Sequence, residues 1–197
     1  KKLLFFAIQN QKKANFKNAK NAYEKIIKLN PDIISAHYNL GLVLTKLGEN
    51  EKAIRCYEQV IRKNPQVADA HNNLGLIYYK LGDTKKALNY YENAIKINPN
   101  YSNAFNNIGL VYANKGQYEQ AIENYNKIDT KNSKKFLILG DMLELGKHSS
   151  KQHKLISKIL NKTKIDKVYV IGKFIKETFK GLNLSKKAKV LNNKFEI

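Results

Sequence analysis

The sequence predicts a mainly α-helical protein in which helical hairpins stack into a superhelix, followed by a small α/β module with a parallel sheet. The first observation is the spacing of proline: Pro31, Pro65 and Pro99, the only prolines in the chain, lie 34 residues apart. A period of 34 residues is typical of stacked two-helix repeats. The second observation is that this period ends near residue 133, where short apolar runs ending in glycine begin. Such runs indicate buried strands.

Each copy of the repeat carries two apolar stripes at helical spacing. In residues 34–67 the first stripe contains Leu40, Leu44 and Leu47, and the second contains Ala53, Ile54, Tyr57 and Ile61. Gly48 suits the turn between the helices, because glycine readily adopts the left-handed conformation that ends a helix. Pro65 ends the second helix, since proline has no amide hydrogen to donate. A single hairpin cannot bury both stripes, so the copies must stack.

The period also sets the expected boundaries. The repeat array is predicted to span residues 1–132, with copies at 1–33, 34–67, 68–101 and 102–132, and the α/β module is predicted to span residues 133–197. The first copy is degenerate: its second helix keeps Ala19, Tyr23 and Pro31, but Phe6-Ala7 replaces the Leu-Gly pair of its first helix. A worn copy is expected at the end of a stack.

The recurring positions also carry a family resemblance. The pairs Leu40-Gly41, Leu74-Gly75 and Ile108-Gly109 align with one another, as do the glycines, alanines and tyrosines at Gly48, Gly82 and Gly116, at Ala53, Ala87 and Ala121, and at Tyr57, Tyr91 and Tyr125. This pattern resembles the tetratricopeptide repeat (TPR). The resemblance implies a noncatalytic protein-interaction scaffold whose groove binds an extended peptide or a partner protein.

Three asparagines recur at the period in the first helices of the last three copies: Asn39, Asn73 and Asn107. Tetratricopeptide proteins with such a ladder hold a peptide backbone, and a side-chain amide supplies both a donor and an acceptor for it. The residues expected to surround the ladder are Asn72, Asn106, Asn103, Tyr38, Tyr79 and Lys80. The alternative interpretation is that these asparagines are ordinary polar surface in an asparagine-rich chain.

Other members of the family grip a C-terminal carboxylate with lysine and arginine in the groove. This chain has Tyr38, Leu42, Asn103 and Asn107 at those positions, which argues against such a clamp. His37 and His71 occupy the position of Phe105 in the later copy, so packing between helices is expected for them rather than metal binding or catalysis. The array is therefore predicted to bind no cofactor or metal.

Alternating strand and helix patterns follow the array. Strands are expected at 134–140, 168–172 and 188–191, and helices at 149–161 and 174–179. This alternation predicts a small parallel sheet. The apolar face of the last repeat helix, around Ile122, Tyr125 and Ile128, is expected either to be covered by the module that begins at Lys134 or to be left exposed.

One string within this module contains Gly140, Asp141, Met142, Glu144 and Gly146, and His153 follows nine residues after Glu144. These residues resemble the C-terminal domain of the Mur ligases, in particular the ATP-dependent enzymes that add D-Ala-D-Ala to the bacterial peptidoglycan precursor. The chain lacks the glycine-lysine-threonine phosphate loop that these ligases carry on another domain. The prediction is therefore no enzyme activity and no cofactor, with a turn-forming Asp141 and a helix-packing His153.

Two other interpretations of the module remain open. It could be a fragment or accessory of a peptidoglycan-precursor ligase that acts with a separate ATP-binding domain, or it could be a fusion remnant without a joint function.

The formal net charge of +20 raises the question of nucleic-acid binding. Among 36 basic residues only Arg55 and Arg62 are arginine, and base and phosphate recognition depends strongly on the arginine fork. The composition therefore argues against specific nucleic-acid binding. The single cysteine, Cys56, suits a reducing compartment, and no apolar run has the length of a membrane helix. A cytoplasmic location is expected.

Overall fold

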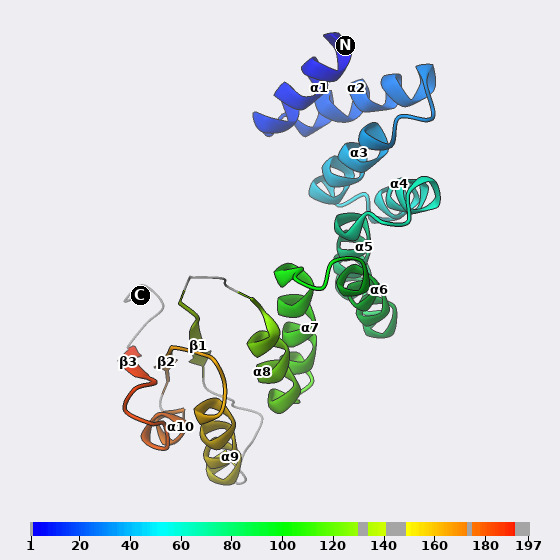
Figure 1. Cartoon of the computed structure of the whole chain (residues 1–197). Helices are drawn as coiled ribbons and strands as arrows, with labels where there is room; N and C mark the ends of the chain where they lie inside the picture. The colour runs from blue at the N-terminus through cyan, green and yellow to red at the C-terminus, as the bar shows by residue number, and fades with distance from the viewer. Residues whose placement is uncertain (1, 130–133, 141–148, 173–174, 192–197) are drawn as a thin grey trace. The chain divides into compact units, whose positions relative to one another are not determined.

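The computed structural model describes residues 2–129, 134–140, 149–172 and 175–191. Within these ranges the helices and strands follow one another as drawn in Figure 1: α1 (Lys2–Lys12), α2 (Phe16–Leu29), α3 (Ile34–Leu47), α4 (Asn50–Lys63), α5 (Ala68–Lys80), α6 (Thr84–Ile97), α7 (Ser102–Asn114), α8 (Tyr118–Lys127), β1 (Phe136–Gly140), α9 (Ser149–Asn161), β2 (Lys167–Ile171), α10 (Lys176–Lys180) and β3 (Lys187–Leu191). The predicted fold class, helical hairpins followed by a small parallel sheet, is confirmed.

Each of the four predicted copies contains two helices, the degenerate first copy included. The chain divides into two compact units, Lys1–Ala104 and Phe105–Ile197. In the first unit, each helix from α1 to α6 packs against the next along the chain. The second unit thus contains most of α7, all of α8 and the α/β module.

Glycine ends the first helix of a hairpin, as the sequence predicts. Gly48, Gly82 and Gly116 all adopt the left-handed conformation, with φ of 76°, 83° and 71°. A residue with a Cβ is strained in this region, whereas glycine is not. The chain can therefore reverse within two or three residues and return as the second helix.

Asparagine and proline together end the second helix of the first three copies. Asn30, Asn64 and Asn98 precede the three prolines and have extended conformations, with φ between −130° and −147°. The residue before a proline is restricted to this region. The side-chain oxygen of each asparagine accepts the backbone N–H two residues later, at 3.0 to 3.1 Å. These recurrent asparagines therefore have a structural role in the turn.

The close approach of paired helices depends on glycine and tyrosine. The ring of Tyr57 lies over Gly41, and the ring of Tyr91 lies over Gly75. Both tyrosines are fully buried. In the last hairpin, Tyr125 does not cover Gly109: its hydroxyl donates instead to the Phe136 carbonyl oxygen at the start of β1, at 2.6 Å.

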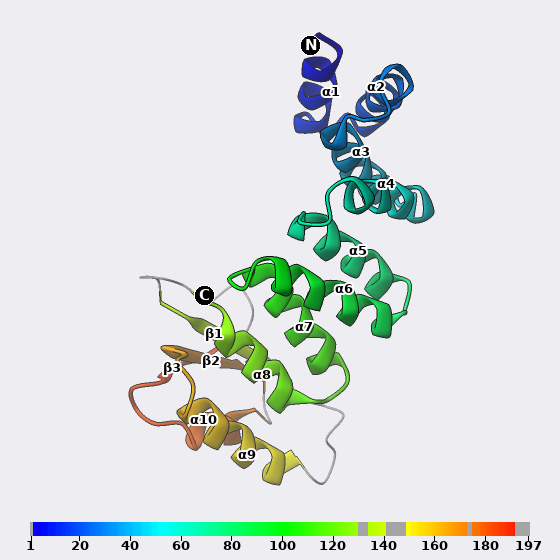
Figure 2. The same cartoon turned by 45° about the vertical axis from the view of Figure 1, so that its right-hand side comes forward.

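The sheet of the second unit has three parallel strands in the order β1-β2-β3 (Figures 1 and 2). β1 and β2 pair from Phe136↔Lys167 to Gly140↔Ile171, and an irregularity shifts the register between β2 and β3. Leu137, Leu139, Val168 and Val170 turn toward one core, where α9 contributes Ile156 and Leu160. The predicted strands and helices of this module are confirmed within one or two residues.

The same core includes Ile122 of α8, with Tyr118 and Tyr125 packed at its margin. The expectation that the module covers the apolar face of the last repeat helix is thus confirmed for Ile122 and Tyr125. Within the described parts of the chain, no helix has the length and apolarity needed to cross a membrane.

Candidate functional site

The strongest candidate binding surface lies on the first helices of the second and third copies, α3 and α5. Tyr38 and Asn39 are neighbours on α3, and Asn73 is the residue of α5 that corresponds to Asn39. All three side chains are half-buried. The Asn73 amide nitrogen lies 3.4 Å from the Tyr38 hydroxyl, which links the two helices. We call Tyr38, Asn39 and Asn73 the amide face.

The contact between Asn73 and Tyr38 is long for an N–H donor to an oxygen, for which about 2.7–3.2 Å is usual. It is therefore a weak hydrogen bond. The Tyr38 ring meets the buried Tyr57 ring edge to face, with centroids 5.9 Å apart. Burial raises the pKa of the Tyr38 hydroxyl, so this group stays neutral. The amide face thus offers uncharged donors and acceptors on a rigid aromatic base.

A second polar contact in the first unit was not predicted. The Tyr101 hydroxyl donates to the Asp69 carboxylate near the start of α5. Burial raises the pKa of Tyr101, and the hydrogen bond to the Asp69 carboxylate raises it further. Asp69 also acts on Tyr38 through its charge, which raises the Tyr38 pKa. Neither Asp69 nor Tyr101 recurs at the period, so the repeat gave no signal for this pair.

The other predicted groove residues are distributed as follows. On α5, Asn72 is buried, Tyr79 is half-buried, and Lys80 is exposed in the last helical turn. On α7, Asn103 is exposed in the first unit, whereas Asn106 and Asn107 belong to the second unit. The amide face of the first unit therefore contains two rungs of the predicted ladder, Asn39 and Asn73.

The two repeat histidines pack as expected. Both are buried. The Nε2 atom of His37 lies 2.9 Å from the Pro31 carbonyl oxygen, and that of His71 lies 3.2 Å from the Pro65 carbonyl oxygen. Each histidine thus attaches the start of its helix to the preceding proline turn. The described residues contain no cluster of three His, Cys, Asp or Glu side chains that could hold a metal ion.

His71 is expected to make the stability of the fold depend on pH. Burial lowers the pKa of His71, and its Nδ1 atom has no hydrogen-bond partner among the described residues. A proton on Nδ1 would therefore be buried without an acceptor. Near and below the ordinary histidine pKa of about 6.5, His71 therefore binds a proton more readily in the unfolded chain than in the folded chain. The contribution of neutral His71 to stability is present above that pH and is lost as the pH falls.

We therefore expect the free energy of unfolding to fall more between about pH 7.5 and about pH 5.5 in the wild type than in His71→Phe. Phenylalanine is the fair replacement because Phe105 occupies this position in the next copy. Urea titrations followed by circular dichroism at both pH values measure the difference. Equal pH dependence in the two proteins would show that His71 does not cause it.

Cys56 is buried in the core of the first unit. Burial raises the pKa of its thiol to about 11. Because the thiolate is the reactive form, Cys56 is a packing residue rather than a nucleophile.

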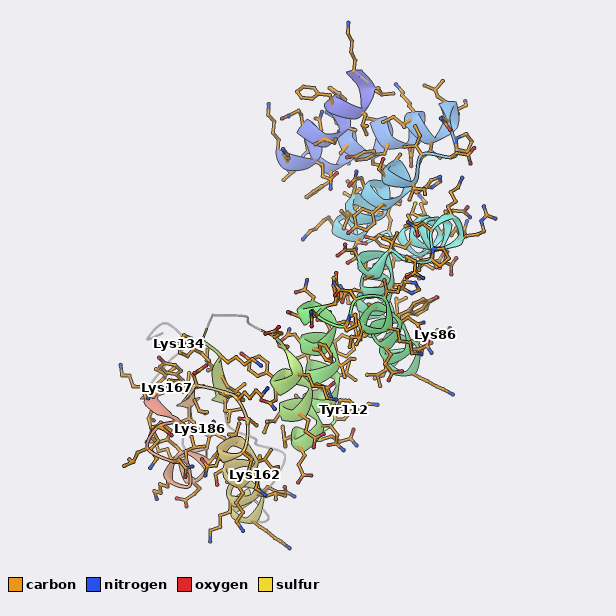
Figure 3. All side chains as sticks on the ribbon, in the orientation of Figure 1. Lys86, Tyr112, Lys134, Lys162, Lys167 and Lys186 are labelled. Carbon is orange, nitrogen blue, oxygen red and sulfur yellow. The ribbon has the colours of Figure 1, made fainter. Side chains whose placement is uncertain are left out.

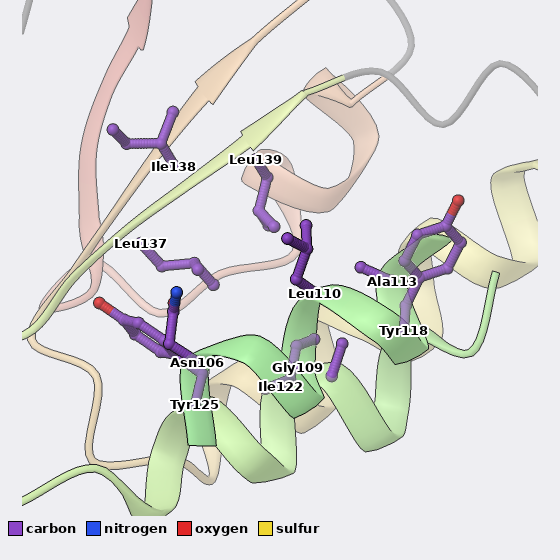
Figure 4. A pocket seen from close by; sticks show the side chains of 11 residues that line it. Asn106, Gly109, Leu110, Ala113, Tyr118, Ile122, Tyr125, Leu137, Ile138 and Leu139 are labelled. Atoms are coloured by element: carbon purple, nitrogen blue, oxygen red, sulfur yellow. The ribbon is translucent and has the colours of Figure 1, made fainter. Parts of the chain in front are cut away.

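The second unit contains an apolar cavity of about 320 Å³ between its last hairpin and β1 (Figure 4). Its lining residues are Asn106, Gly109, Leu110 and Ala113 of α7, Tyr118, Ala121, Ile122 and Tyr125 of α8, and Leu137, Ile138 and Leu139 of β1. Of the three β1 residues, Ile138 turns its side chain to the other side of the strand. Asn106, one of the predicted groove residues, thus borders this apolar space.

Four of the residues in the Mur-like string, Asp141, Met142, Glu144 and Gly146, lie outside the described residues. Gly140 ends β1, and His153 is fully buried on α9. The Nδ1 atom of His153 lies 2.8 Å from the Thr178 hydroxyl of α10. This contact joins the two helices that pack on the sheet, as expected for a histidine with a packing role.

Comparison with protein families identifies the repeats. Models described as TPR repeat or tetratricopeptide repeat match residues 10–33, 22–55, 41–82, 68–101 and 90–123. Together these matches extend without a gap from residue 10 to residue 123. A search among curated proteins finds no match.

Several solved structures resemble the chain. The crystal structure of MamA is 30% identical, with a TM-score of 0.60 over 64% of this chain and 73% of MamA. MamA from Desulfovibrio magneticus RS-1 is 25% identical, with a TM-score of 0.60 over 64% of this chain and 71% of its own. YrrB, described as a TPR protein with an unusual peptide-binding site, is 26% identical, with a TM-score of 0.56 over 61% of this chain and 62% of YrrB. The chain belongs to the tetratricopeptide repeat family.

Proposed function

We propose that the chain is a noncatalytic scaffold that binds an extended peptide segment of a partner protein on the amide face of α3 and α5. Membership of the tetratricopeptide repeat family supports the general role in protein–protein interaction. The similarity to YrrB, a TPR protein with a peptide-binding site, supports a peptide as the kind of ligand.

The observation that carries the proposal is the weak contact between Asn73 and Tyr38. At 3.4 Å this hydrogen bond is weak, so breaking it to free the Asn73 amide costs little energy. A peptide backbone that offers a carbonyl oxygen at a shorter distance replaces this contact without leaving a buried group unpaired. Asn39 presents the same chemistry on α3, one residue after Tyr38.

The side-chain chemistry of the amide face suits an extended ligand. Side-chain amides pair with backbone N–H and C=O groups, which every peptide carries, so they select for conformation rather than sequence. The exposed Lys80 at the end of α5 adds a positive charge on the same helix. We therefore expect the amide face to tolerate varied side chains and to favour peptides with an acidic residue.

Replacing both Asn39 and Asn73 with alanine tests the proposal. Peptides of about 12 residues, which extend to about 40 Å, are selected from a random display library on the wild-type chain. We expect the double variant to bind them about tenfold more weakly, because two net hydrogen bonds are lost. Fluorescence anisotropy gives the affinities, and circular dichroism confirms that helicity is retained.

Asn89→Ala is the matched control, because Asn89 is an exposed asparagine on α6, the second helix of the same copy. It should leave binding unchanged. Unchanged capture by the double variant, or an equal loss in the control, would show that the recurrent asparagines are ordinary polar surface.

The Mur-like string supports a second candidate, an accessory of peptidoglycan-precursor ligation that works with a separate ATP-binding domain. We favour a noncatalytic module, because the one motif side chain within the described ranges, His153, is fully buried and contacts Thr178. ATP-dependent ligation by the purified chain would contradict this choice.

A further inference from the structure

The sheet of the second unit has one face turned away from its core. Leu137 and Leu139 point into the core, and Figure 4 shows Ile138 pointing to the opposite side of β1. Phe136 and Ile138 are 49% and 46% exposed. Tyr169 of β2 meets Phe136 edge to face, with ring centroids 6.2 Å apart. We call Phe136, Ile138 and Tyr169 the open sheet face.

The topology explains why the chain's own connecting helices leave this face uncovered. The strand order β1-β2-β3 means that both crossovers run in the same direction. Because parallel crossovers are almost always right-handed, both connecting helices must then lie on the same side of the sheet. The core residues agree: α9 contributes Ile156 and Leu160, and Phe179 of α10 packs beside them. Among the described residues of the second unit, neither connecting helix packs on the open sheet face.

A parallel sheet with one bare apolar face is unusual, since such sheets are normally covered on both sides. The dimensions of this sheet fit a single helix. Three strands spaced about 4.8 Å apart span about 10 Å, which is close to the diameter of a helix with its side chains. Strands of five residues are about 16 Å long, which equals about three helical turns.

The charges beside the open sheet face are positive. Lys134 precedes β1 on the side of Phe136, since the intervening Lys135 turns back to donate to the Asn126 carbonyl oxygen at 2.8 Å. Lys167 is the register partner of Phe136. Figure 3 labels both lysines at the sheet. Lys186 does not contribute to this charge, because its ammonium group donates to the carbonyl oxygens of Thr163 and Ile165 at 2.8 and 2.7 Å. The carboxylate of Asp166, which precedes β2, accepts the Lys135 backbone N–H at 2.7 Å.

The apolar centre of the open sheet face and the lysines beside it distinguish between the possible ligands. A second copy would place the same lysines against one another, and like charges across an interface are unfavourable. A nucleic acid would match the charge, but phosphate recognition favours arginine, and the only arginines, Arg55 and Arg62, lie in the first unit. An amphipathic helix with acidic flanks matches the apolar centre, the width and the charge.

We propose that the open sheet face binds one amphipathic helix of a partner protein, about three turns long, whose apolar stripe covers Phe136, Ile138 and Tyr169 and whose acidic flank pairs with Lys134 and Lys167. This site is separate from the amide face in residues and in ligand conformation. The amide face would take an extended segment, and the open sheet face takes a helix.

The test uses the full chain and a fluorescein-labelled synthetic peptide of about 14 residues, which forms about four helical turns. The peptide carries leucine at helical spacing and glutamate beside each leucine, and a scrambled peptide of the same composition lacks the stripe. We expect the striped peptide alone to bind. Phe136→Ser and Lys134→Glu should each weaken binding about tenfold.

Two matched controls carry the same chemical changes elsewhere in the second unit. Leu184→Ser alters a residue that is 84% exposed between α10 and β3, and Lys158→Glu alters an exposed lysine of α9. Both should bind the peptide as the wild type does. Circular dichroism checks that all four variants are folded.

Four outcomes would overturn the proposal. The first is that the striped peptide does not bind the wild type. The second is that the variants and their controls lose equal affinity for this peptide. The third is a dimer in sedimentation that Phe136→Ser dissociates, which would assign the face to a second copy. The fourth is a single-stranded oligothymidine that binds the wild type and not Phe136→Ser, which would assign it to nucleic acid.

Discussion

Gly75→Ala should lower the free energy of unfolding by about 2–3 kcal/mol, because the added methyl group overpacks a closed helix pair. A Cβ on Gly75 would lie 2.5 Å from the Tyr91 ring and 3.1 Å from the Ala87 carbonyl oxygen. Tyr91 is 1% exposed, so its ring has no free space to enter. Moving the backbone would separate α5 from α6. Urea denaturation followed by circular dichroism measures the loss.

The same substitution at Gly109 is the control. Gly109 holds the same repeat position, but its only near neighbour is the Ala121 carbonyl oxygen at 3.2 Å. We expect Gly109→Ala to cost less than about 1 kcal/mol, since a small shift relieves the contact and alanine favours the helix. If the two substitutions destabilise the chain equally, the tyrosine ring is not what requires glycine at this position.

Ile122→Ala should cost about 3 kcal/mol, the usual range for truncating a large aliphatic side chain in a core. Ile122 is 5% exposed and belongs to the same cluster as Ile156 and Leu160. Its loss removes packing between α8 and the α/β module. We expect the variant to be cleaved faster by a protease between α8 and β1, and limited proteolysis with mass spectrometry detects this.

Leu110→Ala serves as the comparison for Ile122→Ala. Leu110 lies on α7 at the same apolar cavity, yet it is 48% exposed. Removing it should cost less than about 1 kcal/mol, because little buried surface is lost. A module that stays equally stable and resistant to protease in both variants would show that α8 does not support it.

The helices of the array could be predicted from the sequence because their determinants are local. Apolar spacing defines each helix, and glycines such as Gly48 and prolines such as Pro65 define where it ends. The parallel sheet could be predicted for a related reason, since a short apolar run such as Val168–Ile171 is bounded by polar residues. Even the degenerate first copy kept enough of its second helix to be recognised.

The candidate site was less predictable because it depends on contacts between different copies. The period located Asn39 and Asn73, but it did not show that Tyr38 lies within reach of Asn73. It also gave no sign of the Asp69–Tyr101 pair, which occurs once. Asn72 is next to Asn73 in the sequence, but neighbouring residues of a helix point in different directions. Asn72 is therefore buried, which the period alone did not show.

The different position of Tyr125 has a consequence for the length of the array. Elsewhere the tyrosine lies over the glycine of its own hairpin, and each copy is closed before the next begins. Tyr125 instead donates to Phe136, so the last copy is completed by the first strand that follows it. A further copy inserted after α8 would have to release that tyrosine and separate Ile122 from the core that it shares with Ile156 and Leu160. An added repeat at this junction would therefore cost native contacts of the second unit.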